Sequence, residues 1–247
     1  MTDEQFDIQY TPRVIEAHEL YSPQMGEERT IKVYLPPNYD ALKKYPVLYC
    51  HDGNEFFTHG RIATIANQMI YEGRLRSLII VGIAVNHKFR TDDYAPNGAR
   101  HQQYSEFVLD TCLPFVESTY LVDSSNRFMA GISLGAAVTM ALYLRVPRLL
   151  PRLLLFSGAY YSTVQKNAKM REDFTNLETY MVVGRQETAV DTQAGPYDFY
   201  SLNQEMRDLL QSRGARVEYV EADGTHIWGF WQKQLPAALE WLNEACR

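Results

Sequence analysis

Short runs of apolar residues alternate with helical patterns along most of this chain, and this alternation restricts the fold more than any other feature. "SLIIVGIAV" (77–85), "RLLLFSG" (152–158) and "TYMVVG" (179–184) are apolar almost throughout. Such runs are typical of strands covered on both faces, as in a parallel sheet. Helical spacing between them, as in "RIATIANQMIYEG" (61–73), predicts one open, mostly parallel sheet with helices on both faces.

The N-terminal part follows a different pattern. Ile31, Val33 and Leu35 are apolar at a period of two, which predicts a strand with one buried face. A turn-rich segment, "PQMGEE" (23–28), separates this strand from another at 14–22, so we expect an antiparallel hairpin. With 247 residues, no repeat and no linker, residues 1–247 are expected to form a single α/β domain.

The remaining elements follow from the same patterns. We expect helices over about 102–120, 134–146, 199–213 and 230–246, and strands at 45–51, 127–133 and 215–222. The polar, turn-rich segment 86–100 is expected to be a loop, and 159–176 shows no clear pattern.

Charge and composition exclude several classes of partner. The net charge is −6 and no Lys/Arg cluster is present, so nucleic acid is not expected as a partner. No apolar run reaches the roughly 18 to 20 residues that span a bilayer, and the acidic N-terminus is unlike a signal peptide. Cys50, Cys112 and Cys246 are widely spaced, which is typical of reduced thiols. A cytoplasmic protein is therefore expected, and a homo-oligomer remains open.

A serine flanked by small residues marks the junction of one expected strand and helix, in "FMAGISLGAAVTM" (128–140). In G-x-S-x-G, the glycines at 131 and 135 leave room for a strained turn that holds the hydroxyl of Ser133 out at a helix N-terminus. The alternative is an ordinary turn in which Ser133 caps the helix. The buried strand before it and the Ala-rich helix after it favour a nucleophile.

A serine nucleophile needs a base and an acid. In hydrolases with this type of sheet, both follow the serine in the order Ser, acid, His. His226 is the only one of the six histidines after Ser133, so it is the candidate base. Glu187, which follows the strand 179–184, is the preferred acid, and Asp191 is the alternative. Two further possibilities are that Asp198 is the acid, or that Glu187 is only a solvated loop residue with no catalytic role.

The same chemistry requires N–H donors for an oxyanion. One is expected to be the amide of Leu134, and the other to come from the turn "HDGN" (51–54), at Asn54 or Gly53, although a plain Asp-Gly turn explains that segment equally well. His51, Asp52 and His59 lie close together without any recognised metal-ligand spacing, so neither a metal nor a cofactor is expected.

These residues lie within a wider resemblance that covers nearly the whole chain. It runs through "SPQMGEERTIKVYLPPNYD" (22–40), "YPVLYCHDGNEFF" (45–57), "RTDDYAP" (90–96), "LPFVESTYLVDSSNRFMAGISLGA" (113–136) and "GTHIWGFW" (224–231). Together these segments resemble the esterase D and enterochelin-esterase-like esterases, a branch of the α/β-hydrolase fold. The resemblance implies that Ser133 is the nucleophile, His226 the base and Glu187 the acid. Ala136, where the family often has glycine, is a departure.

The resemblance also suggests residues that contact substrate. Trp228 in the G-x-H-x-W-x-x-W ending could line a pocket beside His226, and Arg90 and Tyr94 could reach the mouth of the cleft. For Trp231, core packing of the last helix is an equal alternative.

The sequence therefore predicts a cofactor-free serine esterase that acts on a small-molecule ester through an acyl-enzyme. Two alternatives stay open: an acyltransferase that uses the same acyl-enzyme, and a non-catalytic binding protein on the same fold. The family acts on siderophore esters, S-formylglutathione, feruloyl or acetyl groups and mycolyl esters, and the sequence does not choose among these.

Overall fold

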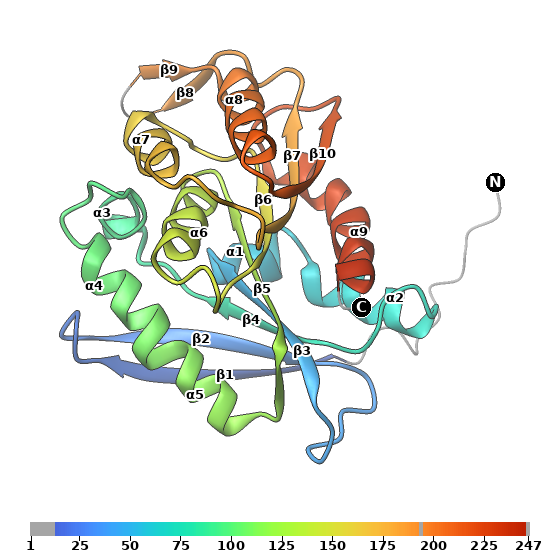
Figure 1. The fold of residues 1–247 in the computed structure, drawn as a ribbon. Coiled ribbons are helices and arrows are strands. Elements are labelled where there is room, and N and C mark those ends of the chain that lie inside the picture. The colour runs from blue at the N-terminus through green and yellow to red at the C-terminus, as the bar shows by residue number, and fades with distance from the viewer. Residues whose placement is uncertain (1–12, 193–194, 246–247) are drawn as a thin grey trace.

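An eight-stranded sheet forms the centre of the computed structural model, which describes residues 13–192 and 195–245 (Figure 1). Its strand order is β1-β2-β4-β3-β5-β6-β7-β10. β2 pairs antiparallel with β1 and β4, and all other pairs are parallel. The strands are β1 (Val14–Ser22), β2 (Glu27–Leu35), β3 (Tyr45–His51), β4 (Ile79–Ile83), β5 (Val122–Ile132), β6 (Arg152–Phe156), β7 (Glu178–Gly184) and β10 (Arg216–Ala222). The predicted mostly parallel α/β sheet with an antiparallel entry is confirmed.

Both faces of the sheet are buried, which explains the continuous apolar runs. Along β3, Val47 and Tyr49 pack on one face, whereas Leu48 and Cys50 pack on the other. On the first face lie α3 (Arg90–Tyr94), α4 (His101–Glu106), α5 (Leu113–Thr119), α6 (Leu134–Arg145), α7 (Ser162–Met170) and α8 (Phe199–Ser212). On the second lie α1 (Gly53–Thr58), α2 (Ile62–Tyr71) and α9 (Trp228–Ala245), as Figure 1 shows.

The predicted helix over 102–120 forms, but its middle is wider than an α-helix. A π-helical segment, Phe107–Cys112, joins α4 to α5. Pro114 is the second residue of α5 and has no N–H to donate to a carbonyl one turn earlier. The π-helical turn lies where this missing hydrogen bond would disturb regular α-helical geometry.

Two segments have more structure than their composition predicted. The expected loop 86–100 contains a 3-10 turn, His87–Phe89, followed by α3, so the prediction was wrong there. Buried Asp93 accepts hydrogen bonds from Arg29 Nη1 at 3.2 Å and Arg100 Nε at 2.8 Å. These ion pairs link residues far apart in the chain, so no local pattern announces them.

The segment 159–176 contains α7, whose apolar pattern is weak because only Val164 and Ala168 of this helix are buried. A short hairpin of β8 (Val190–Thr192) and β9 (Gly195–Tyr197) was also not foreseen.

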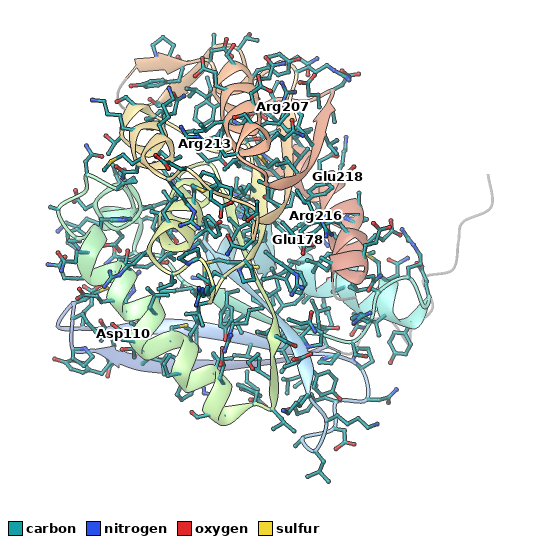
Figure 2. The ribbon with its side chains drawn as sticks, viewed as in Figure 1. Asp110, Glu178, Arg207, Arg213, Arg216 and Glu218 are labelled. Carbon is teal, nitrogen blue, oxygen red and sulfur yellow. The ribbon has the colours of Figure 1, made fainter. Side chains whose placement is uncertain are left out.

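At the open edge of the sheet, the first residues of two parallel strands are joined by an ion pair. Arg216 of β10 lies in register with Glu178 of β7, and its Nη2 donates to Glu178 Oε2 at 3.0 Å (Figure 2).

Cys50 and Cys112 are buried free thiols, and Cys246 lies outside the described residues. Within residues 13–192 and 195–245, no helix has both the length and the apolar character needed to cross a membrane.

Candidate active site

Ser133 occupies a sharp turn between β5 and α6. Its backbone has φ 58° and ψ −120°, a conformation that residues other than glycine rarely adopt. Gly131 and Gly135 lie on either side, and a Cβ on Gly131 would fall 2.1 Å from the carbonyl carbon of Gly135. The turn therefore closes only because Gly131 has no side chain, which is the geometry predicted from G-x-S-x-G.

The structure brings Ser133, His226 and Glu187 into one chain of hydrogen bonds. Ser133 Oγ lies 3.0 Å from His226 Nε2, and His226 Nδ1 lies 2.6 Å from Glu187 Oε2. Because a carboxylate only accepts, Nδ1 carries the proton and Nε2 has a lone pair directed at the serine hydroxyl. Glu187 is fully buried, whereas 16% of the His226 side chain is exposed.

The three residues follow strands in the same half of the sheet, where β6 separates β5 from β7 and β10 lies beside β7. Ser133 follows β5, Glu187 follows β7 and His226 follows β10, each beyond the carboxyl end of its strand. This edge is where ligand sites gather in parallel α/β sheets.

Within the described residues, neither of the other candidate acids forms a hydrogen bond or ion pair with His226, although Asp191 lines the same cavity. Asp191 is exposed on β8, and Asp198 caps α8 by accepting a hydrogen bond from Ser201 N at 2.9 Å. Of the three candidate acids, Glu187 is the one that the structure places in contact with the imidazole.

Ser157 and Trp231 form a hydrogen-bonded chain to Glu187 on the side away from His226. Neither residue was identified from the sequence as part of the site in this way. Ser157 Oγ donates to Glu187 Oε1 at 2.7 Å, and Trp231 Nε1 donates to Ser157 Oγ at 2.8 Å. Gly184 N also donates to Glu187 Oε1, at 2.8 Å. The available signal was a serine at the carboxyl end of the buried run "RLLLFSG" (152–158), on the strand next to the nucleophile.

The predicted oxyanion donors lie at two helix starts. Leu134 is the first residue of α6, where backbone N–H groups have no acceptor within the helix. Gly53 starts α1, and a Cβ there would lie 2.2 Å from Gly82 of β4, so its smallness serves the packing of α1 on the sheet. Asn54 lines a separate cavity, together with Ala84 and Asn86, and not the cavities that Ser133 lines. The oxyanion assignments stay predictions.

Two cavities meet at Ser133 and His226. The main cavity has a volume of about 560 Å³ and is walled on one side by Tyr161, Tyr197 and Phe199. The small cavity has a volume of about 240 Å³, and its lining includes Asp52, Glu55, Trp228 and Trp231. Trp228 thus lies where the sequence placed it.

The two other predicted substrate contacts have different surroundings. Arg90 lines both cavities, but its Nε and Nη2 donate to Asp52 Oδ1 and Oδ2, each at 2.7 Å. Tyr94 is fully buried and lines neither cavity, so its prediction as a substrate contact is wrong. Its hydroxyl accepts a hydrogen bond from Asp52 N at 2.9 Å, and burial raises its pKa well above the usual value. Tyr94 supports the turn after β3 from inside the core.

The histidines near this turn are engaged elsewhere. Buried His51 pairs through Nδ1 with the hydroxyl of Tyr104 at 2.8 Å, and burial, with a further effect of Arg90, lowers its pKa to about 3. His59 stacks against Trp228. In the described part of the chain, no group of three or more His, Cys, Asp or Glu side chains is arranged to hold a metal ion.

The mostly parallel sheet and the strand-to-helix turn that carries Ser133 are typical of the α/β-hydrolase fold. The family model described as "Putative esterase" matches residues 22–242. The chain belongs to this esterase family, which confirms the resemblance seen in the sequence, and it is an enzyme that hydrolyses carboxylic esters.

One curated relative and two solved structures show what else this chain is similar to. "Uncharacterized protein YjcH" of Bacillus subtilis (strain 168) is 30% identical over 230 residues, which are 92% of this chain and 96% of the relative. The structure of a ferulic acid esterase has a TM-score of 0.79 at 19% identity, over 94% of this chain and 98% of that one. The enterobactin esterase FES of Shigella flexneri has a TM-score of 0.83 at 16% identity, over 98% of this chain and 62% of that one. At such identities the two structures show a shared fold.

Proposed function

We propose that this esterase is a serine hydrolase in which Ser133 is the nucleophile, His226 the general base and Glu187 the acid. The observation that carries the proposal is the unbroken hydrogen-bond chain from Ser133 Oγ through the imidazole to the buried carboxylate. A serine hydroxyl is a weak nucleophile until such a base removes its proton.

In the first half-reaction, Ser133 Oγ attacks the ester carbonyl carbon while His226 Nε2 takes the hydroxyl proton. The amide of Leu134, together with an N–H of the 51–54 turn, stabilises the oxyanion of the tetrahedral intermediate. His226 then returns the proton to the leaving alcohol, and Ser133 retains the acyl group. Glu187 holds the ring orientation and stabilises the imidazolium.

In the second half-reaction, His226 takes a proton from water, and the resulting hydroxide attacks the acyl carbonyl. Collapse of the second tetrahedral intermediate releases the carboxylic acid and returns the proton to Ser133. No cofactor enters either step.

The substrate is proposed to be a small ester without a large negative charge. In the main cavity, the rings of Tyr161 and Tyr197 lie 4.4 Å apart and offer an apolar wall. Arg90 is the only Arg or Lys among the described residues lining the two cavities, and Asp52 neutralises it. A strongly anionic ester would therefore find no unpaired cation of that kind there.

The test compares Ser133→Ala with Ser162→Ala, a serine on the wall of the same cavity, using p-nitrophenyl butyrate and a fluorophosphonate probe. We expect Ser133→Ala to lose hydrolysis by at least about 10³-fold and to lose labelling, with Ser162→Ala close to wild type. Undiminished hydrolysis by Ser133→Ala would refute the mechanism.

Two further outcomes separate the alternative functions. A wild-type protein that reacts with no serine-directed probe would indicate a binding protein. Transfer of the acyl group to an added alcohol or thiol in preference to water would indicate an acyltransferase.

A further inference from the structure

Behind Glu187, on the side away from His226, two polar side chains form a second hydrogen-bonded chain. Trp231 Nε1 donates to Ser157 Oγ at 2.8 Å, and Ser157 Oγ donates to Glu187 Oε1 at 2.7 Å. We propose that Ser157 and Trp231 are positioning residues that fix the orientation of the Glu187 carboxylate and, through it, of the His226 ring. This inference rests on the proposed function, because it assigns how the acid of that mechanism is held.

The direction of each hydrogen bond in this chain is determined by chemistry. An indole N–H can only donate and an ionised carboxylate can only accept. Ser157 Oγ must therefore accept from Trp231 and direct its own hydrogen at Glu187. A hydroxyl, which could rotate freely elsewhere, has one arrangement here.

The two carboxylate oxygens of Glu187 therefore have different hydrogen-bond partners. Glu187 Oε1 accepts from Ser157 Oγ and Gly184 N, whereas Oε2 faces His226 Nδ1. Because Glu187 and Ser157 are fully buried, no water replaces these donors readily. The carboxylate plane is thus held by two fixed donors on one oxygen while the other oxygen meets the imidazole.

The segment that carries Ser157 also touches the nucleophile. Ser133 N donates to Phe156 O at 2.9 Å, and Ala159 N donates to Ser133 O at 3.0 Å. Ser157 lies between these two contacts, so the segment 156–159 fixes the nucleophile turn and the acid relative to each other.

The backbone at Ser157 sharpens the inference. Its φ of 45° lies in the left-handed region, which glycine adopts without strain and serine does not. The strained site therefore carries a hydroxyl although glycine would suit the backbone better. This observation also supplies the decisive variant.

The experiment measures kcat and KM for p-nitrophenyl butyrate with Ser157→Gly and Ser157→Ala. If Ser157 acts through its hydroxyl, both variants lose about 10-fold to 100-fold in kcat, the range seen for hydrogen bonds that orient a metal-bound side chain, with KM within about twofold. If Ser157 served only the backbone, Ser157→Gly would relieve strain and keep full kcat, and that result would overturn the proposal.

Trp231→Phe removes the indole N–H and keeps an aromatic ring in the core, but it also removes the five-membered ring, so its control must lose the same volume. We expect a loss in kcat of about 2-fold to 5-fold in the wild-type background and no further loss in the Ser157→Ala background, because residues in one hydrogen-bonded chain are not additive. Losses that simply multiply would indicate independent packing effects and would contradict the chain. Trp241→Phe, the same exchange on the same helix against Phe128 and Tyr180, is the control and should change kcat by less than about twofold.

Two controls keep the outcomes separate. Circular dichroism and thermal unfolding establish that each variant is folded before its kinetics are compared. If Ser133→Ala keeps its activity, the proposed mechanism fails; if Ser133→Ala is inactive while Ser157→Gly is fully active, only the positioning role fails.

Discussion

Gly131 packs directly against the backbone of Gly135, so that a Cβ on Gly131 would lie only 2.1 Å from the carbonyl carbon of Gly135. Real Cβ atoms do not approach backbone so closely, and the neighbour is a helix start that cannot shift freely. The contact fixes where β5 ends and α6 begins, and it holds Ser133 in its strained conformation.

Gly131→Ala is therefore expected to destabilise the fold by about 1 to 3 kcal/mol and to lower esterase activity in the remaining folded protein. Urea unfolding followed by circular dichroism measures the free energy, and hydrolysis of p-nitrophenyl butyrate measures the activity. The control is Gly229→Ala, because a Cβ there would lie 3.9 Å from Ile227 Cδ1 and a helical position favours alanine. Equal stability of the two variants would contradict the steric argument.

The identity of the acid is tested by a matched pair of amide substitutions. Glu187→Gln keeps the shape but removes the charge opposite His226 Nδ1, so kcat should fall by about 10²-fold to 10⁴-fold. Asp191→Asn, on the exposed β8 strand, should change kcat by less than about threefold. Steady-state kinetics of both purified variants decide, and a larger loss from Asp191→Asn would reverse the assignment.

The Arg90–Asp52 ion pair is expected to contribute to stability mainly by protecting a buried carboxylate. The side chain of Asp52 is 5% exposed, and Arg90→Ala would leave it without its cation, at a cost of about 2 to 4 kcal/mol. The double variant Arg90→Ala/Asp52→Asn removes the unpaired charge and should recover at least about 1 kcal/mol of that loss. Free energies of unfolding for the single and double variants test this, and a double variant that is less stable than Arg90→Ala would count against it.

Buried His51 is expected to make stability depend on pH. Its pKa is lowered to about 3 by burial, whereas an unfolded histidine has a pKa of about 6.5, so the unfolded chain binds the extra proton between these values. The contribution to stability is thus complete above about pH 6.5 and is lost as pH falls towards 3, at up to about 1.4 kcal/mol per pH unit.

His51→Asn removes this titration, so its free energy of unfolding should fall less steeply than that of the wild type between pH 6.5 and pH 4.5. Urea unfolding across this range provides the slopes. Parallel curves for wild type and His51→Asn would show that His51 does not titrate as its burial implies.

Much of this protein could be predicted from local sequence. The mostly apolar runs 77–85 and 152–158 indicated strands buried on both faces, because a strand between two helical layers has no polar side. G-x-S-x-G indicated the turn at Ser133, because only residues without bulk fit beside a strained strand-to-helix junction. Chain order left His226 as the single candidate for the base.

Other features depended on contacts that local sequence cannot show. Tyr94 was expected at the cleft and lies in the core, since the cation of Arg90, four residues earlier, is drawn to Asp52 and the ring packs behind the turn. The helix α3 depends on the distant Arg29, which pairs with Asp93. Nothing in the periodicity of either segment records such partners.

The sequence by itself determined the order of the elements, the serine turn and the candidate base, because each rests on steric or hydrophobic patterns within a few residues. Only the tertiary structure decided that Glu187 rather than Asp191 meets His226, and that Ser157 and Trp231 stand behind it. The reason is that the side chains after β5, β6, β7 and β10 meet only when these strands are aligned in one sheet. This alignment determines which carboxylate reaches the imidazole. That alignment joins residues 133, 157, 187 and 226, whose separations along the chain carry no information about distance in space.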